Sequence, residues 1–176
     1  CQNFEISLGN KGMPVEEDRL IAIMQQLIEQ GAQNINLVNP THYATAIAHL
    51  LERWKPPVPV VYNSSGYETV ETLKRLEGLV DIYLPDFKYI RADKAQRYSS
   101  APDYFEKVSL ALLEMRRQVK DVFQEDRMQS GMIVRHLILP ANTNSSLEII
   151  DWLCTHLPGT YLSLMAQYTP CLLYTS

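Results

Sequence analysis

The stretch Met132-Ile-Val-Arg-His-Leu-Ile-Leu139 decides the fold class. It is an apolar, β-branched run interrupted only by Arg135 and His136, and Pro140 ends it, which is typical of a buried strand. A helical pattern follows directly, from about residue 146 to residue 156. A buried strand followed at once by a helix is the repeating unit of an α/β protein.

The same alternation extends to both sides of this stretch. Further strands are expected at 34–38, 58–62, 80–84 and 160–165, and further helices at 16–30, 40–54, 65–76 and 103–119. The third of these helices is expected to begin at the capping box Ser65-x-x-Glu68, and the polar segment 120–130 is expected to be a connector. Five strands alternating with five helices predict right-handed crossovers and a parallel sheet that is covered on both faces. The predicted class is therefore α/β.

Composition limits the functions that the chain can have. With 176 residues, 46% of them hydrophobic and 20% charged, the chain is expected to form one globular domain. Sixteen basic and twenty acidic side chains give a net charge of −4, which offers no electrostatic attraction for nucleic acid. No apolar run approaches the roughly 18 to 20 residues that cross a bilayer, so no membrane partner is expected. Three cysteines without a pairing pattern favour a reducing compartment, and we expect a cytoplasmic protein.

The two ends of the chain call for separate expectations. The first residue is Cys1 and not Met, and a helix is the first predicted element. We therefore expect residues 1–170 to be part of a longer domain whose first strand lies upstream. The last residues, Cys-Leu-Leu-Tyr-Thr-Ser at 171–176, can be encoded by a sequencing adapter, so we expect them to be an adapter-derived, exposed tail.

Polar side chains gather where the predicted strands end. In a parallel sheet, the loops at the carboxyl ends of the strands form the active site. The candidate site residues at these ends are Asn39, Thr41, Asn63, Ser64, Asp86, Lys88, Arg135 and Gln167. We expect them to converge on one edge of the sheet together with Cys1. Arg135 stands in an apolar strand, where a charge is costly unless an anion accompanies it.

Each of these residues also has a purely structural interpretation. Asp86 and Lys88 can form an ordinary ion pair at the edge of the sheet, and Arg135 can pair with Asp86 for structure alone. His136 can be a core histidine whose two nitrogens are hydrogen-bonded. Cys154 lies in the apolar pattern of the helix at 146–156 and is expected to be a core thiol.

Several separated segments resemble a known superfamily. They read CQNFEIS at 1–7, INLVNPTH at 35–42, VYNSSGY at 61–67, DIYLPDFKY at 81–89, APDY at 101–104 and IVRHL at 133–137. In this order they resemble the radical S-adenosylmethionine superfamily, in an uncharacterised branch related to pyruvate formate-lyase activating enzymes. The resemblance runs from residue 1 to residue 170.

This resemblance implies a fold and a cofactor set. The fold would be a truncated, partial (β/α)6 barrel whose first strand is missing. Cys1 would be the last cysteine of a Cys-x-x-x-Cys-x-x-Cys loop and would give one thiolate to a 4Fe-4S cluster, whose open iron site binds the amine and carboxylate of S-adenosylmethionine. Reductive cleavage of that cofactor would release a 5′-deoxyadenosyl radical, which abstracts hydrogen.

The resemblance also assigns residues and partners. Asp86 and Lys88 match an Asp-x-Lys pair of the family and Arg135 matches an arginine, all of which line the cofactor pocket. The sequence departs from the family at residues 39–41, where Asn-Pro-Thr replaces Gly-Gly-Glu, so an oxygen of Asn39 would take over the contact to the cofactor amine. The implied partners are a glycyl radical enzyme or a small molecule as substrate, and flavodoxin or ferredoxin as the electron donor.

Two other functions remain open at this point. Lys88 could form a Schiff base in an aldolase-type barrel, with Asp86 adjusting its protonation. The chain could also be a non-catalytic domain that binds a cofactor or a partner. Two cysteines seven and three residues before Cys1 would favour the radical enzyme over both.

Overall fold

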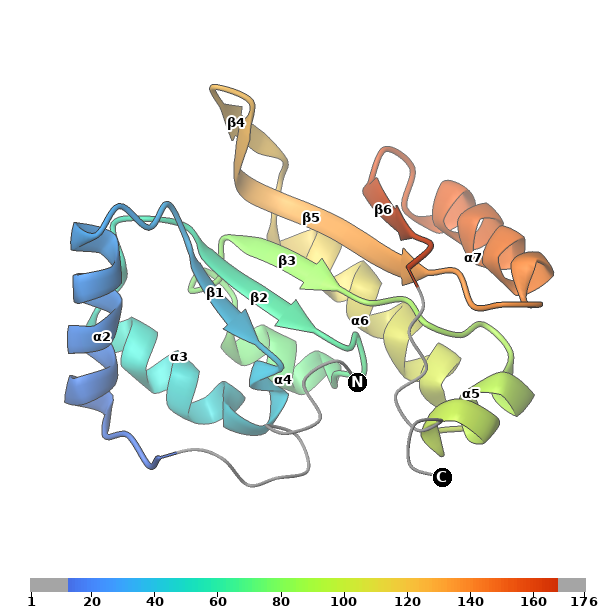
Figure 1. Cartoon of the computed structure of the whole chain (residues 1–176), viewed down its shortest axis with the longest axis horizontal. Coiled ribbons are helices and arrows are strands. Elements are labelled where there is room, and N and C mark those ends of the chain that lie inside the picture. The colour runs from blue at the N-terminus through green and yellow to red at the C-terminus, as the bar shows by residue number, and fades with distance from the viewer. Residues whose placement is uncertain (1–12, 168–176) are drawn as a thin grey trace.

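The structure is a computed structural model that describes residues 13–167 (Figure 1). The predicted cluster ligand Cys1 and the predicted tail at 171–176 lie outside the described residues. Within them, no helix is both long enough and apolar enough to cross a membrane.

A six-stranded sheet organises the described chain. Its strands are β1 (Ile35–Val38), β2 (Val60–Ser64), β3 (Ile82–Pro85), β4 (Val122–Gln124), β5 (Arg127–Leu137) and β6 (Tyr161–Met165). Strands β1, β2, β3, β5 and β6 pair in that order and in parallel, while β4 is antiparallel to β5. The α/β class is confirmed, and the sheet does not close into a barrel within residues 13–167.

Helices connect the successive parallel strands, and one further helix, α2, precedes β1. They are α2 (Glu17–Glu29), α3 (Ala44–Arg53), α4 (Val70–Arg75), α5 (Ala92–Ser99), α6 (Tyr104–Gln118) and α7 (Thr143–His156), with a short 3-10 helix η1 (Pro40–Tyr43) before α3. Apolar residues at three- and four-residue steps explain most of them, because one face of each helix can then be buried.

All of the helices lie on one side of the sheet (Figure 1). Tyr62, Tyr83 and Met132 are neighbours across β2, β3 and β5, and each is at most 1% exposed in the main apolar cluster with α4, α6 and α7. Val60 belongs to the same face and packs with Met24 of α2. For residues 13–167, the expectation that helices cover both faces is therefore wrong. Because the strands keep their chain order, crossovers of one hand place every helix on the same side.

Three local predictions also need correction. Helix α5 was not predicted, and the segment 120–130 is a hairpin and not a plain connector. Glu125 and Asp126 turn this hairpin with φ values of 48° and 62°, as a two-residue turn requires. The predicted capping box is wrong, because Thr69 caps α4 and accepts a hydrogen bond from the Thr72 amide at 3.1 Å.

The opposite side of the sheet, which we call the open face, carries a different set of side chains. A hollow on this face is lined in part by Asn36, Val61, Ile82, Leu84 and Ile133. Side chains alternate along a strand, so the polar residues near the carboxyl ends of β2 and β5 that share this register also face this side. The fold thus directs part of the predicted site towards a surface that the helices do not cover.

Candidate functional site

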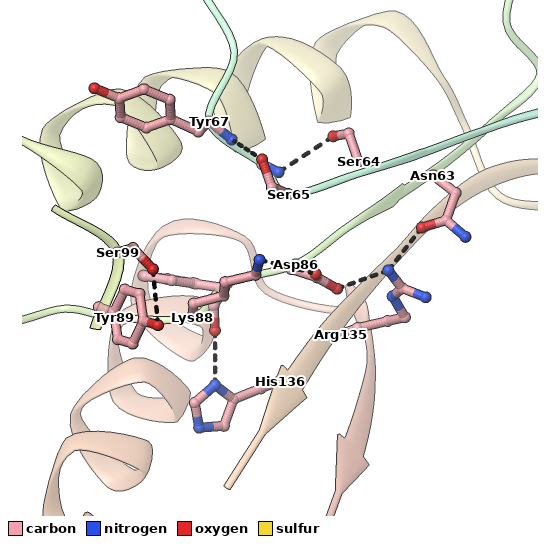
Figure 2. A network of polar contacts seen from close by, with 12 residues as sticks. Asn63, Ser64, Ser65, Tyr67, Asp86, Lys88, Tyr89, Ser99, Arg135 and His136 are labelled. Carbon is pink, nitrogen blue, oxygen red and sulfur yellow. Dashed lines mark hydrogen bonds and ion pairs between the residues drawn. The ribbon is translucent and has the colours of Figure 1, made fainter. Parts of the chain in front are cut away.

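Arg135 is the centre of a polar cluster at the carboxyl edge of the sheet. Its Nη2 donates to Oδ1 of Asn63 at 2.6 Å and lies 2.7 Å from Oδ1 of Asp86 (Figure 2). Asn63 comes from β2, and Asp86 follows β3 and pairs with Arg135 in an isolated parallel bridge. Three neighbouring strands therefore bring an amide, a carboxylate and a guanidinium to one point on the open face.

Lys88 adds a second cation to this cluster. Its Nζ lies 3.7 Å from Oδ2 of Asp86, and its side chain is 41% exposed, whereas that of Arg135 is 25% exposed. Two cations thus share one carboxylate. In addition, Nε of Arg135 is buried and has no hydrogen-bond partner in the structure. A buried donor of this kind favours an acceptor from a ligand.

Ser64 and Asn39 lie next to the cluster through backbone contacts. The carbonyl of Ser64 accepts a hydrogen bond from the Asp86 amide at 2.9 Å, and its hydroxyl accepts one from the Gly66 amide at 3.2 Å. Asn39 has a left-handed backbone, with φ of 51°, and its amide donates to the carbonyl of Asn63 at 2.8 Å. Ser64 is buried and Asn39 is exposed, so only Asn39 offers a side chain to solvent.

Thr41 and Gln167 are not in contact with the cluster. The hydroxyl of Thr41 donates to Oε1 of Glu68 at 2.6 Å, and the hydroxyl of Tyr62 donates to the same oxygen at 3.3 Å. Tyr62 belongs to the helix-covered face, so Thr41 is bound on that side of the sheet. Gln167 follows β6 and is exposed. The predicted convergence therefore holds for Asn39, Asn63, Ser64, Asp86, Lys88 and Arg135.

Glu68 is a buried acid, whereas the local sequence pattern predicts a residue of a helix cap. It is 3% exposed, and its Oε2 is buried without a hydrogen-bond partner. Burial raises the pKa of Glu68, although the hydroxyls of Thr41 and Tyr62 act in the opposite direction. The local pattern predicts a capping box because Ser65 stands three residues before Glu68.

His136 and Cys154 are both outside the site. Nδ1 of His136 lies 2.6 Å from the Phe87 carbonyl and Nε2 lies 2.8 Å from the Ser146 hydroxyl, so the interpretation as a core histidine is confirmed. Since a carbonyl only accepts, Nδ1 carries the hydrogen. Cys154 is exposed, and its assignment to the core was wrong. Leu153, one position earlier on α7, takes the buried position.

No group of three or more His, Cys, Asp or Glu side chains that could hold a metal ion occurs within residues 13–167. The cluster can nevertheless bind a ligand with both charges. The carboxylate of Asp86 can accept from an ammonium or a hydroxyl, and Arg135 and Lys88 can donate to a carboxylate.

Sequence comparison finds a relative of the chain. It is 29% identical over 180 residues to the uncharacterized protein MJ0674 of Methanocaldococcus jannaschii, an alignment that covers 97% of this chain and 49% of that protein. The chain thus spans about half the length of this curated relative. No family model matches the chain. No solved structure matches it either.

Proposed function

We propose that the chain is the core of a radical S-adenosylmethionine enzyme and that the cluster around Arg135 binds the methionyl part of this cofactor. The observation that carries the proposal is the meeting of Asn63, Asp86, Lys88 and Arg135 at the carboxyl edge of the sheet. The choice of this family rests on the sequence segments that resemble the radical S-adenosylmethionine superfamily. The order of the parallel strands is compatible with part of a barrel.

The residues of the cluster fit the cofactor chemically. The methionyl group carries an ammonium and a carboxylate. The buried Nε of Arg135 lacks an acceptor. Lys88 shares its only carboxylate partner in the cluster, Asp86, with Arg135. Charge-assisted hydrogen bonds from these cations would hold the cofactor carboxylate, and Asp86 would accept from the ammonium or a ribose hydroxyl.

When bound to a 4Fe-4S cluster that includes Cys1, the cofactor would supply reductive C–S cleavage and a 5′-deoxyadenosyl radical. The residues of this chain would orient the cofactor and neutralise its charges. A glycyl radical enzyme or a small molecule as substrate, and flavodoxin or ferredoxin as electron donor, are part of the same proposal.

The structure gives less support to a Schiff-base enzyme. A nucleophilic lysine is generally activated by desolvation. The side chain of Lys88 is 41% exposed and lies 3.7 Å from the carboxylate of Asp86. A borohydride-trapped adduct on Lys88, formed with a carbonyl compound, would nevertheless favour this alternative.

The first test is reconstitution of the full-length protein with iron and sulfide without oxygen. We expect about four iron atoms per chain and, after reduction, release of 5′-deoxyadenosine from S-adenosylmethionine. A protein that binds the cofactor but no iron would be a non-catalytic binding domain. A protein that binds neither would contradict the proposal.

The second test compares Arg135→Met with Arg116→Met. Arg116 forms a matched pair with Asp121 at the other edge of the sheet, at 2.7 Å and with side chains 28% and 21% exposed. The Asp86 pair has the same distance, with side chains 25% and 22% exposed. We expect Arg135→Met to weaken S-adenosylmethionine binding about ten- to a hundred-fold, the loss of a charge-assisted hydrogen bond, and Arg116→Met to leave it unchanged.

Binding titrations and thermal melts of both variants separate the two roles. An unchanged cofactor affinity together with a large loss of stability in Arg135→Met would show that Arg135 is a structural partner of Asp86.

A further inference from the structure

The hydroxyl of Tyr104 joins the two loops that carry the site. Tyr104 is the first residue of α6 and is 3% exposed. Its oxygen lies 2.8 Å from the Ser65 carbonyl, 2.8 Å from the Asp86 carbonyl and 3.0 Å from the Lys88 amide, which donates to it. Ser65 follows β2, whereas Asp86 and Lys88 follow β3. One side-chain atom therefore contacts the backbone of both loops.

These three contacts fix the position of the Tyr104 hydroxyl. It has one hydrogen for two carbonyls, and its lone pairs accept from the Lys88 amide. Burial raises the pKa of Tyr104, so the hydroxyl keeps its hydrogen. Without the hydroxyl, a part-buried carbonyl and the Lys88 amide would lose their partner, which costs more than the hydrogen bond alone contributes.

The surroundings of Tyr104 hold its ring in place. The ring stacks on Tyr67 with 6.0 Å between centroids and 2° between planes, and it meets Tyr89 edge to face at 5.4 Å. The backbone of the two loops is also in close contact, because a Cβ on Gly66 would clash with the Asp86 carbonyl oxygen. The loops therefore meet in a single arrangement that Tyr104 completes.

We propose that Tyr104 is a positioning residue of the site, whose hydroxyl holds the loops after β2 and β3 so that Asp86 and Lys88 face the ligand at Arg135. The identity of the ligand rests on the proposed function, but the role of Tyr104 as a link between the loops does not. Figure 2 shows Ser64 at the end of β2 and Ser65 directly after it, and Asp86 and Lys88 in the segment after β3.

The test compares Tyr104→Phe with Tyr67→Phe. Both variants remove one hydroxyl from one of two stacked rings. The Tyr67 hydroxyl bonds Asp103 at 2.7 Å and Lys107 at 3.1 Å, and not the loop backbone, so it is a matched control. We expect Tyr104→Phe to weaken S-adenosylmethionine binding about ten-fold and Tyr67→Phe to leave it unchanged.

A second measurement needs no ligand. Hydrogen exchange of the Lys88 amide, which donates to the Tyr104 hydroxyl, should become faster in Tyr104→Phe and stay unchanged in Tyr67→Phe. Both variants are measured below their melting transitions, so a lower stability does not obscure the comparison.

The outcomes have separate meanings. Faster Lys88 exchange with weaker binding supports the positioning role, and faster exchange with unchanged binding overturns it. Unchanged exchange overturns the link between the loops. If the wild-type protein does not bind S-adenosylmethionine, the proposed function fails, and the role of Tyr104 is judged by the Lys88 exchange alone.

Discussion

Two ion pairs of nearly identical geometry lie at opposite edges of the sheet. Asp86 and Arg135 are 2.7 Å apart at the carboxyl edge, and Asp121 and Arg116 are 2.7 Å apart close to Met132, where β5 pairs with the first residues of β3. They differ in what else the carboxylate contacts. Oδ1 of Asp121 also accepts from the Met132 amide at 3.3 Å, whereas the hydrogen bonds and ion pairs of the Asp86 carboxylate go to side chains alone.

The difference follows from the polarity of the backbone. Strands present free N–H groups where they begin and free carbonyls where they end, and a carboxylate can satisfy only the former. Asp81 confirms the pattern at the amino edge, since its Oδ2 accepts from the Val60 amide at 2.9 Å. The carboxylates at the amino edge thus hold backbone amides of the sheet, while the Asp86 carboxylate at the carboxyl edge is held by the side chains of Arg135 and Lys88.

The largest effect that would test this comparison concerns two glycines. Gly66 at the carboxyl edge and Gly78 before β3 have similar φ values, 75° and 79°, but only Gly66 is in close contact. A Cβ at Gly66 would clash with the Asp86 carbonyl oxygen and would lie 2.8 Å from Val108, while one at Gly78 would meet nothing within 4 Å. We expect Gly66→Ala to destabilise by about 3 kcal/mol or more and Gly78→Ala by about 1 kcal/mol.

Urea unfolding of both variants measures the difference. Because the backbone strain is matched, the excess in Gly66→Ala reports the close packing of Gly66 against the loop after β3 and against Val108 of α6. Equal losses would mean that the loops can separate without cost, and the carboxyl edge would then be less rigid than we infer.

The second effect concerns the amino edge alone. Asp81→Ala leaves the buried Val60 amide without its acceptor, so we expect a loss of about 1 to 3 kcal/mol in the free energy of unfolding. Asp81→Asn keeps an oxygen at this position and should lose less. Neither variant should change the affinity for S-adenosylmethionine, as measured by titration. A weaker affinity in Asp81→Asn would contradict the view that carboxylates at the amino edge act on the fold alone.

The smallest effect is a difference in pH dependence. Burial raises the pKa of Glu68 at the carboxyl edge, so its contribution to stability is complete below the unfolded value of 4.5 and is lost as the pH rises through the folded pKa. In the last turns of α6, Arg117 lowers the pKa of Glu114 to about 2. The contribution of Glu114 is present above 4.5 and is lost as the pH falls towards 2.

The variants Glu68→Gln and Glu114→Gln should therefore shift stability in opposite senses. At neutral pH we expect Glu68→Gln to be more stable than the wild type and Glu114→Gln to be less stable, with both differences shrinking at low pH. Denaturant unfolding between about pH 2 and pH 8 measures this, because the Glu114 contribution is lost only below 4.5. A Glu68→Gln variant that loses stability at neutral pH would show that the acid is ionised and well solvated in the folded protein.

The sequence predicts the strands and the main site residues because both have a local signal. Met132 to Leu137 is apolar enough to be a strand in any context, and Arg135 is conspicuous as a charge within it. Helix α5 gave no such signal, since Ala95 is its only buried residue, and β4 gave none because all three of its residues are exposed. A periodic pattern of apolar residues arises where one face of an element is buried. Elements that bury few side chains therefore lack this pattern and are not predicted.

The role of Tyr104 could not be predicted for a different reason. Its partners are backbone atoms of Ser65, Asp86 and Lys88, between 16 and 39 residues away in the chain. No side-chain pattern encodes a contact to a backbone atom that any residue would supply. The position of Glu68 could not be predicted for a similar reason. Its hydrogen bond with Thr41 spans 27 residues, whereas the local pattern indicates a helix cap.

The order of the strands also bears on how the chain folds. Each parallel strand from β1 to β6 pairs with the next parallel strand along the chain, and β4 pairs locally with β5 in a hairpin. A chain that leaves the ribosome can therefore add one strand and its helix at a time to an existing edge. No strand has to be inserted between two that are already paired, which keeps loop-closure costs low during synthesis.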